Sequence, residues 1–356
     1  MTTSATSLVV ANGSPLFVGF PWAGVARILD RGWGLDDLRA HRLQLLEAAR
    51  LRERGLPLPP ELAEEARRAQ LSHLIARTLL ERVREVCSGP LLVLKGAEVA
   101  TWYPAPGLRP FIDVDVLVPD AMAVERQLRS VGFRGVGPQM DWDALHHVQG
   151  LAAPDLPIRV EVHRRPKWVG GVAQPPLDEL FANAVPSATG IDGVLAPAPA
   201  MHAVLLAAHA WAERPLGRVG DLVDVSAMAR SGGDAAEFAS RWGLERMWRT
   251  TVTVADGLFD DGRTTWPLRV WARHLPRVRE RTVLESHVER LLAPFWGLPP
   301  RRALRASARG FARTAKPMPN ERWGDKLART RRAIRNALVR RSEHDRGLRG
   351  DKEDER

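Results

Sequence analysis

Two short segments in the middle of the chain alternate polar and apolar residues, and this pattern limits the fold more than any other feature. Residues 112–118 read Ile-Asp-Val-Asp-Val-Leu-Val, and residues 158–163 read Ile-Arg-Val-Glu-Val-His. Alternation with a period of two is typical of strands that pack one face on a core. A third apolar run of strand length, residues 91–94, precedes them. Because helix-like segments lie between these runs, the sequence predicts a small α/β unit over residues 89–196.

Helical patterns flank this unit on both sides. On the N-terminal side, helices are expected over residues 36–54 and 61–86. In the second of them, apolar residues recur every four positions, at Leu71, Ile75, Leu79 and Val83. On the C-terminal side, helices are expected over residues 199–213, 218–230, 234–242, 245–259, 281–293 and 324–341.

These patterns together predict an α/β (α+β) fold with a small mixed sheet and helices at both ends. We expect four parts along the chain. They are an N-terminal helical segment (1–88), the α/β core (89–196), a C-terminal all-helical domain (197–340) and a disordered charged tail (341–356).

The net charge of +10 is concentrated at the C-terminal end. Residues 301–356 hold 18 Lys and Arg against 8 Asp and Glu, so the first 300 residues hold 34 of each sign. A basic segment of this kind can bind nucleic acid, an acidic protein or anionic lipid, or it can be a solvated helix face. A solvated face is the favoured interpretation, because no aromatic residues for base stacking are interleaved with the charges. A polynucleotide enzyme usually has a basic groove in its core, so nucleic acid is not the favoured partner.

Cysteine content and hydropathy allow a prediction of the cellular compartment. The single cysteine, Cys87, excludes a disulfide scaffold and a Cys-rich zinc site. The N-terminus, MTTSATSLVV, has no basic residues before its apolar run, so no secretory signal is expected. The most apolar stretch, residues 194–212, contains Pro197 and Pro199, so no membrane span is expected either. We therefore predict a cytoplasmic protein.

The sharpest chemical feature is the pair Asp113 and Asp115. In a strand, residues two apart point to the same face, so these two carboxylates lie side by side and repel unless a cation compensates them. Mg²⁺ takes carboxylate and phosphate oxygens as ligands. Glu161 on the other predicted strand could add a third carboxylate, and His163 would share its face. Two solvated acids on an edge strand are the alternative, but the apolar residues around the pair favour a buried strand.

Lys95 and Gly96 follow the first predicted strand and precede a helix-like segment. A glycine at this point lets a ligand approach the backbone, and Lys95 could place a positive charge beside a triphosphate. A glycine turn with an exposed lysine explains the same residues equally well. The segment is not a Walker A loop, because no GxxxxGK[ST] motif occurs.

Order and spacing join these motifs into a larger pattern. In chain order it comprises Leu94-Lys95-Gly96-Ala97, Tyr103-Pro104, Gly107-Leu108-Arg109-Pro110, Asp113-Val114-Asp115-Val116-Leu117-Val118, Gly132-Phe133, His146-His147 and Val160-Glu161-Val162-His163. In the helical half, it continues with His209, Arg218, Asp221 and Asp224. Over residues 65–230 this pattern resembles the uncharacterised nucleotidyltransferase family of the polymerase-beta-like nucleotidyltransferase superfamily.

The resemblance implies a nucleotidyltransferase core and a metal-dependent reaction. A nucleoside monophosphate would pass from an NTP, with ATP favoured, to a small-molecule, peptide or protein acceptor, and pyrophosphate would leave. The family's catalytic metal ligands correspond to Asp113, Asp115 and Glu161, which would hold two Mg²⁺ ions, with Mn²⁺ as the alternative. The nucleotide-binding residues would be Lys95, Gly96 and Arg109. Contacts to substrate are expected from His163, His209, Arg218 and Asp221.

Two other functions stay open at this point. One is a catalytically inactive member that binds nucleotide and acts as an interaction module. The other is an RNA-directed nucleotidyltransferase that uses the basic C-terminal tail. The intact set Asp113, Asp115 and Glu161 favours an active enzyme. Arg218, Asp221 and Asp224 could equally form an ion-pair network that ties the helical domain to the core.

Residues from about Arg340 onward are predicted to be dispensable for the core reaction. The final string, RRSEHDRGLRGDKEDER, contains Leu348 as its lone apolar residue, so it cannot bury enough surface to offset its ordering entropy. Upstream, Leu327, Ile334 and Leu338 could line one side of a docked helix.

Truncation after Val339 should therefore leave the thermal melting temperature and metal-dependent NTP binding unchanged. Loss of NTP binding on truncation would contradict this prediction. A salt-dependent loss of transfer alone would indicate a polyanionic acceptor.

Overall fold

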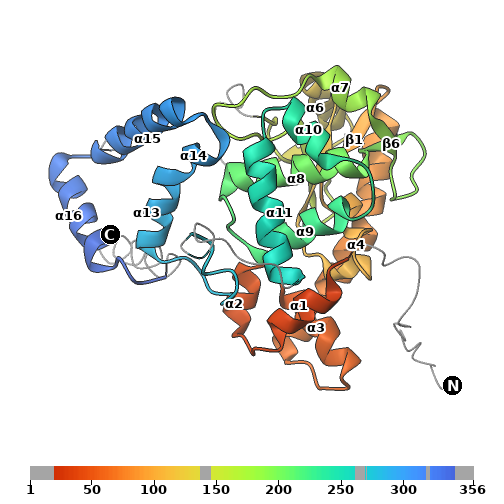
Figure 1. The fold of residues 1–356 in the computed structure, drawn as a ribbon. Helices are drawn as coiled ribbons and strands as arrows, with labels where there is room; N and C mark the ends of the chain where they lie inside the picture. Colours follow the sequence, from red (N-terminus) through yellow and green to blue (C-terminus); the bar gives the residue numbers. More distant parts are fainter. Residues whose placement is uncertain (1–19, 137–145, 261–268, 270, 318–320, 341–356) are drawn as a thin grey trace.

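The structure, a computed structural model, describes residues 20–136, 146–260, 269, 271–317 and 321–340. A mixed sheet lies between helices, and further helices extend from it toward the C-terminus (Figure 1). This architecture confirms the predicted α/β (α+β) fold with helices at both ends. The strands are β1 (Leu91–Val93), β2 (Asp113–Leu117), β3 (Arg134–Gly135), β4 (Leu151–Ala152), β5 (Arg159–His163), β6 (Ala184–Pro186) and β7 (Val194–Pro197).

The strand order is β3-β4-β5-β2-β1-β7-β6, which places the two strands with acidic residues side by side. β2 pairs in parallel with β5, and the register sets Asp115 opposite Glu161. β1 pairs antiparallel with β2 and in parallel with β7, so the sheet is mixed. The three predicted strands therefore form the centre of the sheet.

The two faces of the sheet pack against different helices. Val114 and Val116 of β2 share an apolar cluster with α4 (Pro60–Val86) and α6 (Ala121–Ser130). Leu117, which points to the other face, shares a cluster with α8 (Pro199–Glu213). Because side chains alternate along a strand, the acidic residues of β2 and β5 lie on the face toward α8.

Short elements and helices complete the described chain. On the N-terminal side and within the core, these are α1 (Trp22–Leu29), α2 (Leu35–Ala40), α3 (Gln44–Glu53), α5 (Ala97–Ala100), the 3₁₀ turn η2 (Pro106–Leu108) and α7 (Leu177–Ala182). On the C-terminal side, these are α9 (Val219–Ala229), α10 (Ala235–Arg241), α11 (Glu245–Phe259), α13 (Val283–Leu292), α14 (Pro294–Gly297), α15 (Pro300–Ala315) and α16 (Trp323–Arg335). The apolar helix expected over residues 199–213 is α8, which is buried nearly all round.

The prediction of one helix over residues 36–54 is wrong, because the chain breaks between α2 and α3. Arg42 has a φ of 58°, a conformation that ends a helix. The break lets the His41 carbonyl accept a hydrogen bond from the Gly220 N–H at 2.9 Å. A Cβ on Gly220 would lie 2.8 Å from that oxygen, so only glycine allows this contact. A tertiary contact with α9 therefore overrides the local helical pattern.

Two expectations about apolar helix faces are also wrong. Leu71 is 53% exposed, because α4 changes the face that it buries along its length, from Leu62 near α3 to Leu79 near the sheet. On α16, Leu327 and Ile334 are exposed as well. The described C-terminal helices therefore present apolar side chains to solvent.

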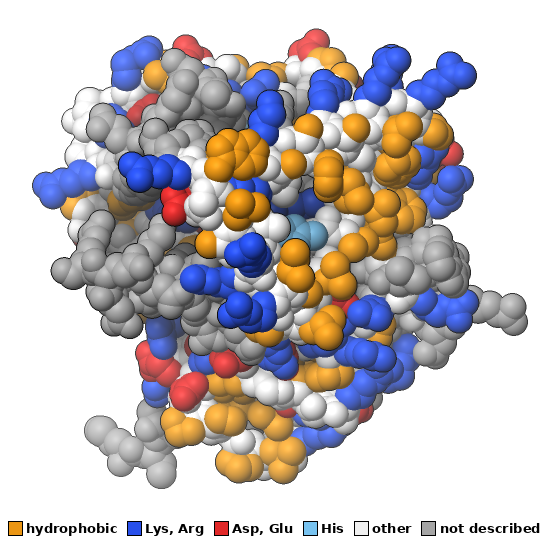
Figure 2. Space-filling model, turned by 90° about the vertical axis from the view of Figure 1, so that its left-hand side faces the viewer, with side chains coloured by type: hydrophobic (Ala, Val, Ile, Leu, Met, Phe, Trp, Pro, Cys, Tyr) orange, Lys and Arg blue, Asp and Glu red, His pale blue; other side chains and the backbone are white. Residues whose placement is uncertain are grey.

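The excess of positive charge lies on these same C-terminal helices. Residues 301–340 hold 13 Lys and Arg against 2 Asp and Glu. Figure 2 shows Lys and Arg side chains interspersed with hydrophobic ones on the side of the molecule that carries α13, α15 and α16. α15 was not expected from its pattern of apolar residues, because arginines and alanines dominate its sequence. Within the described residues, no helix is both long and apolar enough to cross a membrane.

Arg340 belongs to the folded part of the chain. Its guanidinium forms an ion pair with Asp37 of α2 at 2.9 Å, and the adjacent Val339 carbonyl accepts from the Val283 N–H at 3.0 Å. A truncation that preserves these contacts ends after Arg340, one residue later than the sequence indicates. The predicted tail, residues 341–356, lies outside the described residues.

Gly96 has a backbone conformation that the fold requires. Its φ is 68°, and a Cβ there would meet the Asp113 carbonyl oxygen at 2.8 Å. Gly96→Ala should therefore lower the free energy of unfolding by roughly 1–3 kcal/mol, measured by urea denaturation. Gly89→Ala is the matched control, since a Cβ on Gly89 would meet open space. Equal stability of the two variants would contradict the requirement for glycine.

Candidate active site

Parallel pairing of β2 and β5 brings three metal-ligating side chains together. Asp115, Glu161 and His163 each offer a ligand atom, and these atoms lie within 4.8 Å of one another. Nε2 of His163 donates a hydrogen bond to Oδ1 of Asp115 at 2.8 Å. Asp115 is 7% exposed and His163 is 2% exposed, so these two ligands lie in the interior of the protein, while Glu161 is half-buried.

The electrostatics of this cluster favour a bound cation. Burial raises the pKa of Asp115, but the hydrogen bond from His163 and the charge of Lys95 outweigh burial, and the net pKa is below its usual range. Burial and the neighbouring charges of Asp115 and Asp113 raise the pKa of Glu161. Nδ1 of His163 is buried without a hydrogen-bond partner. Two carboxylates and one imidazole whose ligand atoms lie within 4.8 Å, together with the repulsion between Glu161 and its acidic neighbours, fit a divalent ion.

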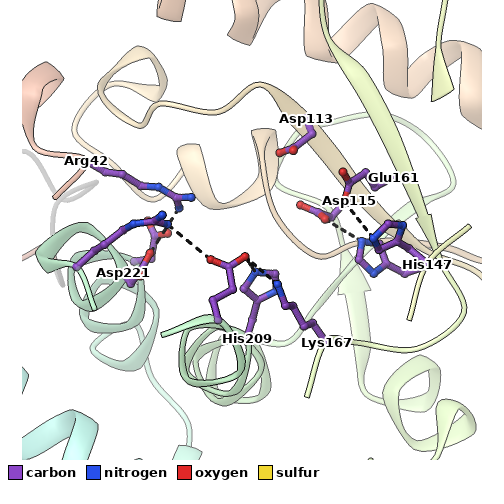
Figure 3. A network of polar contacts seen from close by, with 12 residues as sticks. Arg42, Asp113, Asp115, His147, Glu161, Lys167, His209 and Asp221 are labelled. Atoms are coloured by element: carbon purple, nitrogen blue, oxygen red, sulfur yellow. Dashed lines mark hydrogen bonds and ion pairs between the residues drawn. The ribbon is translucent and has the colours of Figure 1, made fainter. Parts of the chain in front are cut away.

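Asp113 lies at the rim of this cluster rather than within it. Its Oδ2 accepts a hydrogen bond from Nη2 of Arg159 at 3.2 Å, and the same nitrogen lies 3.6 Å from Oε1 of Glu161. Figure 3 shows the side chains of Asp113, Asp115 and Glu161 on the same side of the sheet. The structure therefore brings the three predicted carboxylates onto one face, with Asp113 paired to an arginine.

Two further histidines pack behind the cluster. Nε2 of His147 lies 4.0 Å from Oε2 of Glu161, and its ring lies 5.4 Å from that of His163. Burial lowers the pKa of His146 to about 3, so this ring is neutral at physiological pH. The adjacent pair His146-His147 is visible in the sequence, but only the isolated bridge between His147 and His163 places it at the site.

Lys95 and the residues of α8 form the opposite wall. A small cavity of about 20 Å³ lies between Lys95, Asp115, His163 and His209. Burial lowers the pKa of Lys95, while the charge of Asp115 raises it. Burial also lowers the pKa of His209 to about 4, so its imidazole is neutral. The predicted residues Lys95 and His209 therefore face the carboxylate cluster across a narrow gap.

Glu213 connects this wall to a network of charged side chains. Its Oε1 accepts hydrogen bonds from Lys167 at 3.0 Å and from His209 at 3.2 Å. Its Oε2 lies 3.6 Å from Nη1 of Arg218. The hydrogen bond from His209 is the main cause of the lowered pKa of Glu213.

The same network reaches the N-terminal helices. Asp221 lies 3.4 Å from Nη1 of Arg42, and Figure 3 shows both on the far side of His209 from the carboxylates. The sequence analysis did not identify Glu213, Arg42 or Lys167 as site residues. Glu213 could have been identified, because it lies four residues after His209 on the same helix. Arg42 and Lys167 have no such signal, because only the tertiary fold brings them near.

Arg109 has a different environment from the one predicted. It is 4% exposed, and its guanidinium binds Asp224 through two hydrogen bonds of 2.9 and 2.8 Å. The Tyr103 hydroxyl donates to the same carboxylate at 2.7 Å, and Nη1 of Arg109 donates to the Gly96 carbonyl at 3.3 Å. Arg109 therefore supports the Lys95-Gly96 turn through the Gly96 carbonyl, and its predicted contact with the nucleotide stays a prediction. Asp224 forms the ion pair that ties the helical half to the core.

A comparison with known protein families identifies the family of this chain. The chain matches the family model described as uncharacterised nucleotidyltransferase over residues 33–260. This is more than half of its length, so the protein belongs to that family. The match extends the resemblance seen over residues 65–230 on both sides, from the N-terminal helices to α11, and leaves α13–α16 outside it. No curated protein and no solved structure gives a match.

The buried ring of His202 should make the stability of the folded protein depend on pH. This buried ring donates from Nε2 to the Leu94 carbonyl at 2.6 Å, and burial lowers its pKa from 6.5 to about 4. The unfolded chain takes up a proton near pH 6.5, whereas the folded chain does so only near pH 4. Stability should therefore fall as the pH falls through this window, with a contribution of at most about 1.4 kcal/mol per pH unit.

The measurement is urea unfolding of the wild type and of His202→Gln across this pH range. The variant should show the shallower dependence of unfolding free energy on pH, because glutamine does not titrate. An identical slope in the two proteins would show that His202 does not titrate in this way.

Proposed function

We propose that this protein transfers a nucleoside monophosphate from an NTP to an acceptor hydroxyl. The observation that carries the proposal is the convergence of Asp115, Glu161 and His163, which faces Lys95 across the site, in a chain of a nucleotidyltransferase family. ATP is the donor that we would test first, and a small molecule, peptide or protein is the proposed acceptor.

The proposed metal site uses residues of both central strands. Asp115, Glu161 and His163 would hold a divalent ion, and Asp113 at the rim would contribute to a second. Divalent ions, when bound, neutralise the triphosphate and stabilise the charge that develops during displacement at the α-phosphorus. Mg²⁺ is the proposed cofactor. The imidazole of His163 in the donor set is the reason to test Mn²⁺ beside it.

The side chains around the cluster have separate proposed roles. Lys95 would bind a phosphate oxygen, and the absence of a side chain at Gly96 keeps its turn close to β2. The acceptor oxygen would bond to the α-phosphorus as the bond to pyrophosphate breaks. Glu161, whose pKa is raised, would take the hydroxyl proton. Neutral His209 would line the site and hold Glu213 in place.

The direct experiment is incubation of the protein with each α-³²P-labelled NTP, Mg²⁺ or Mn²⁺, and a lysate of the source organism. We expect label on one molecular species, which would identify both the base and the acceptor class. Binding of NTP without transfer of label would instead favour the inactive interaction module.

One observation favours RNA as a second candidate acceptor. Residues 301–340 carry 13 Lys and Arg against 2 Asp and Glu, mostly on the exposed helices α15 and α16. Treatment of the lysate with ribonuclease before the labelling reaction separates the two candidates. Loss of the labelled species after this treatment would favour RNA.

Asp115→Asn and Asp113→Asn should each reduce transfer by at least about a hundredfold while the fold stays intact. The physical reason is loss of a carboxylate that binds the cation. Thermal melts should show that both metal-free variants stay folded, and because the fold lowers the pKa of Asp115, Asp115→Asn should not melt above the wild type. Asp192→Asn, which changes an exposed carboxylate, is the matched control. Full activity of either site variant would exclude the proposed metal site.

A further inference from the structure

A second, larger cavity lies beside the candidate active site. It has a volume of about 570 Å³ and is lined by α2, by the end of α8 and the turn that follows it, by α13 and the residues just before it, and by Arg340. Pockets for small molecules typically measure about 300–1,000 Å³. The cavity is therefore large enough for a metabolite, whereas the space between Lys95 and Asp115 is not.

The wall of this cavity is rich in arginine. Among the described residues, seven arginines line it against five carboxylates. Most of these arginines already form ion pairs: Arg340 with Asp37, Arg218 with Glu213, Arg39 with Glu65 and Arg42 with Asp221. Arg214 is exposed to the cavity at the end of α8. The wall therefore offers many forked hydrogen-bond donors to a ligand in the cavity.

The contacts of Arg281 independently indicate that this cavity binds a ligand. It is 7% exposed and lines the cavity, and its Nη2 donates to the Pro215 and Leu216 carbonyls at 2.6 and 3.0 Å. Its Nη1 is buried without a hydrogen-bond partner and has only a long ion pair, with Oε2 of Glu289 at 3.8 Å. A buried guanidinium nitrogen without an acceptor is costly, and an anionic oxygen would satisfy it.

Two of the arginines are held in a poorly solvated place. Burial is the main cause that lowers the pKa of Arg218, and the charge of Arg42 adds to it while Asp221 and Glu213 oppose it. Burial lowers the pKa of Arg281 to about 10, although the charges of Glu289 and Glu285 raise it. Burial therefore makes these charges costly in the empty cavity, and a bound anion would reduce that cost.

Glu213 lies between the cavity and the carboxylate cluster. Glu213 lines the cavity, where it faces Arg218, and on its other side it accepts hydrogen bonds from His209 and Lys167. His209 in turn lines the small space next to Asp115. A molecule in the cavity would therefore lie next to the proposed reaction centre without occupying the metal site.

We infer that this arginine-lined cavity binds the phosphate group of a small-molecule acceptor, whose hydroxyl end points toward the carboxylate cluster. The inference rests on the proposed function and names its acceptor class. Guanidinium groups recognise phosphate through paired hydrogen bonds, and Arg281 is held rigidly by two backbone carbonyls for this purpose. The donor triphosphate would bind on the other side of Glu213, at Lys95.

The test is titration calorimetry of the full-length protein with glycerol 3-phosphate, with EDTA present so that no divalent ion contributes. Glycerol is the uncharged control ligand. We expect glycerol 3-phosphate alone to bind, and Arg281→Gln to weaken binding by about tenfold or more. Because Arg281 also supports the backbone, Arg214→Gln is a second variant that should weaken binding without loss of fold. Arg305→Gln on exposed α15 is the matched control and should bind as the wild type does.

Two further measurements distinguish this inference from the proposed function. Asp115→Asn should lose metal-dependent ATP binding but keep glycerol 3-phosphate binding, and saturating Mg²⁺-ATP should leave the phosphate probe bound to the wild type. Competition between the two ligands would show that the cavity belongs to the donor triphosphate, and would overturn the inference. Equal binding by the Arg281, Arg214 and Arg305 variants would overturn it as well. Absence of metal-dependent ATP binding in the wild type would count against the proposed function, not against the cavity.

Discussion

Parallel pairing of β2 with β5 is the constraint on which the candidate site depends. The register places Asp115 directly beside Glu161, and the alternation of side chains then sets His163 on the same face. Slippage by one residue would turn this whole set toward α4 and α6 and bury charges in an apolar cluster. The valines that alternate with the acidic residues make such slippage unfavourable. The pattern that forms the core therefore also fixes the chemistry of the site.

A second interaction joins the sheet to the helical half of the molecule. Asp224 of α9 is buried together with Arg109 and Tyr103, and Arg109 also holds the carbonyl of Gly96. Burial of these charges is compensated because each makes several hydrogen bonds. This ion pair fixes α9, and with it α8, relative to the turn that carries Lys95. His209 and Glu213 can therefore face the carboxylates of β2 and β5 across a narrow gap.

The N-terminal helices extend the site beyond the sheet and α8. The break at Arg42 lets the chain turn against α9, and Arg42 then lies near Asp221. α2 also forms part of the arginine-lined cavity. The family match begins at residue 33 and so includes α2 but not α13, although both line the cavity. One side of this cavity is thus built from the family's fold and the other from a segment that the match does not cover.

The amino-acid pattern alone predicts the central strands, the long helix α4, the helices from α8 to α11 and the carboxylates that share one face. These features follow from local periodicity, which is a property of neighbouring residues along the chain. Three features depend on the packing of the whole chain: the burial of Arg109 against Asp224, the pairing of Asp113 with Arg159, and the positions of Arg42 and Lys167 near the site. Contacts between residues far apart in the chain depend on how the elements pack. No local pattern records them, because a surface arginine and a buried one have the same sequence signature.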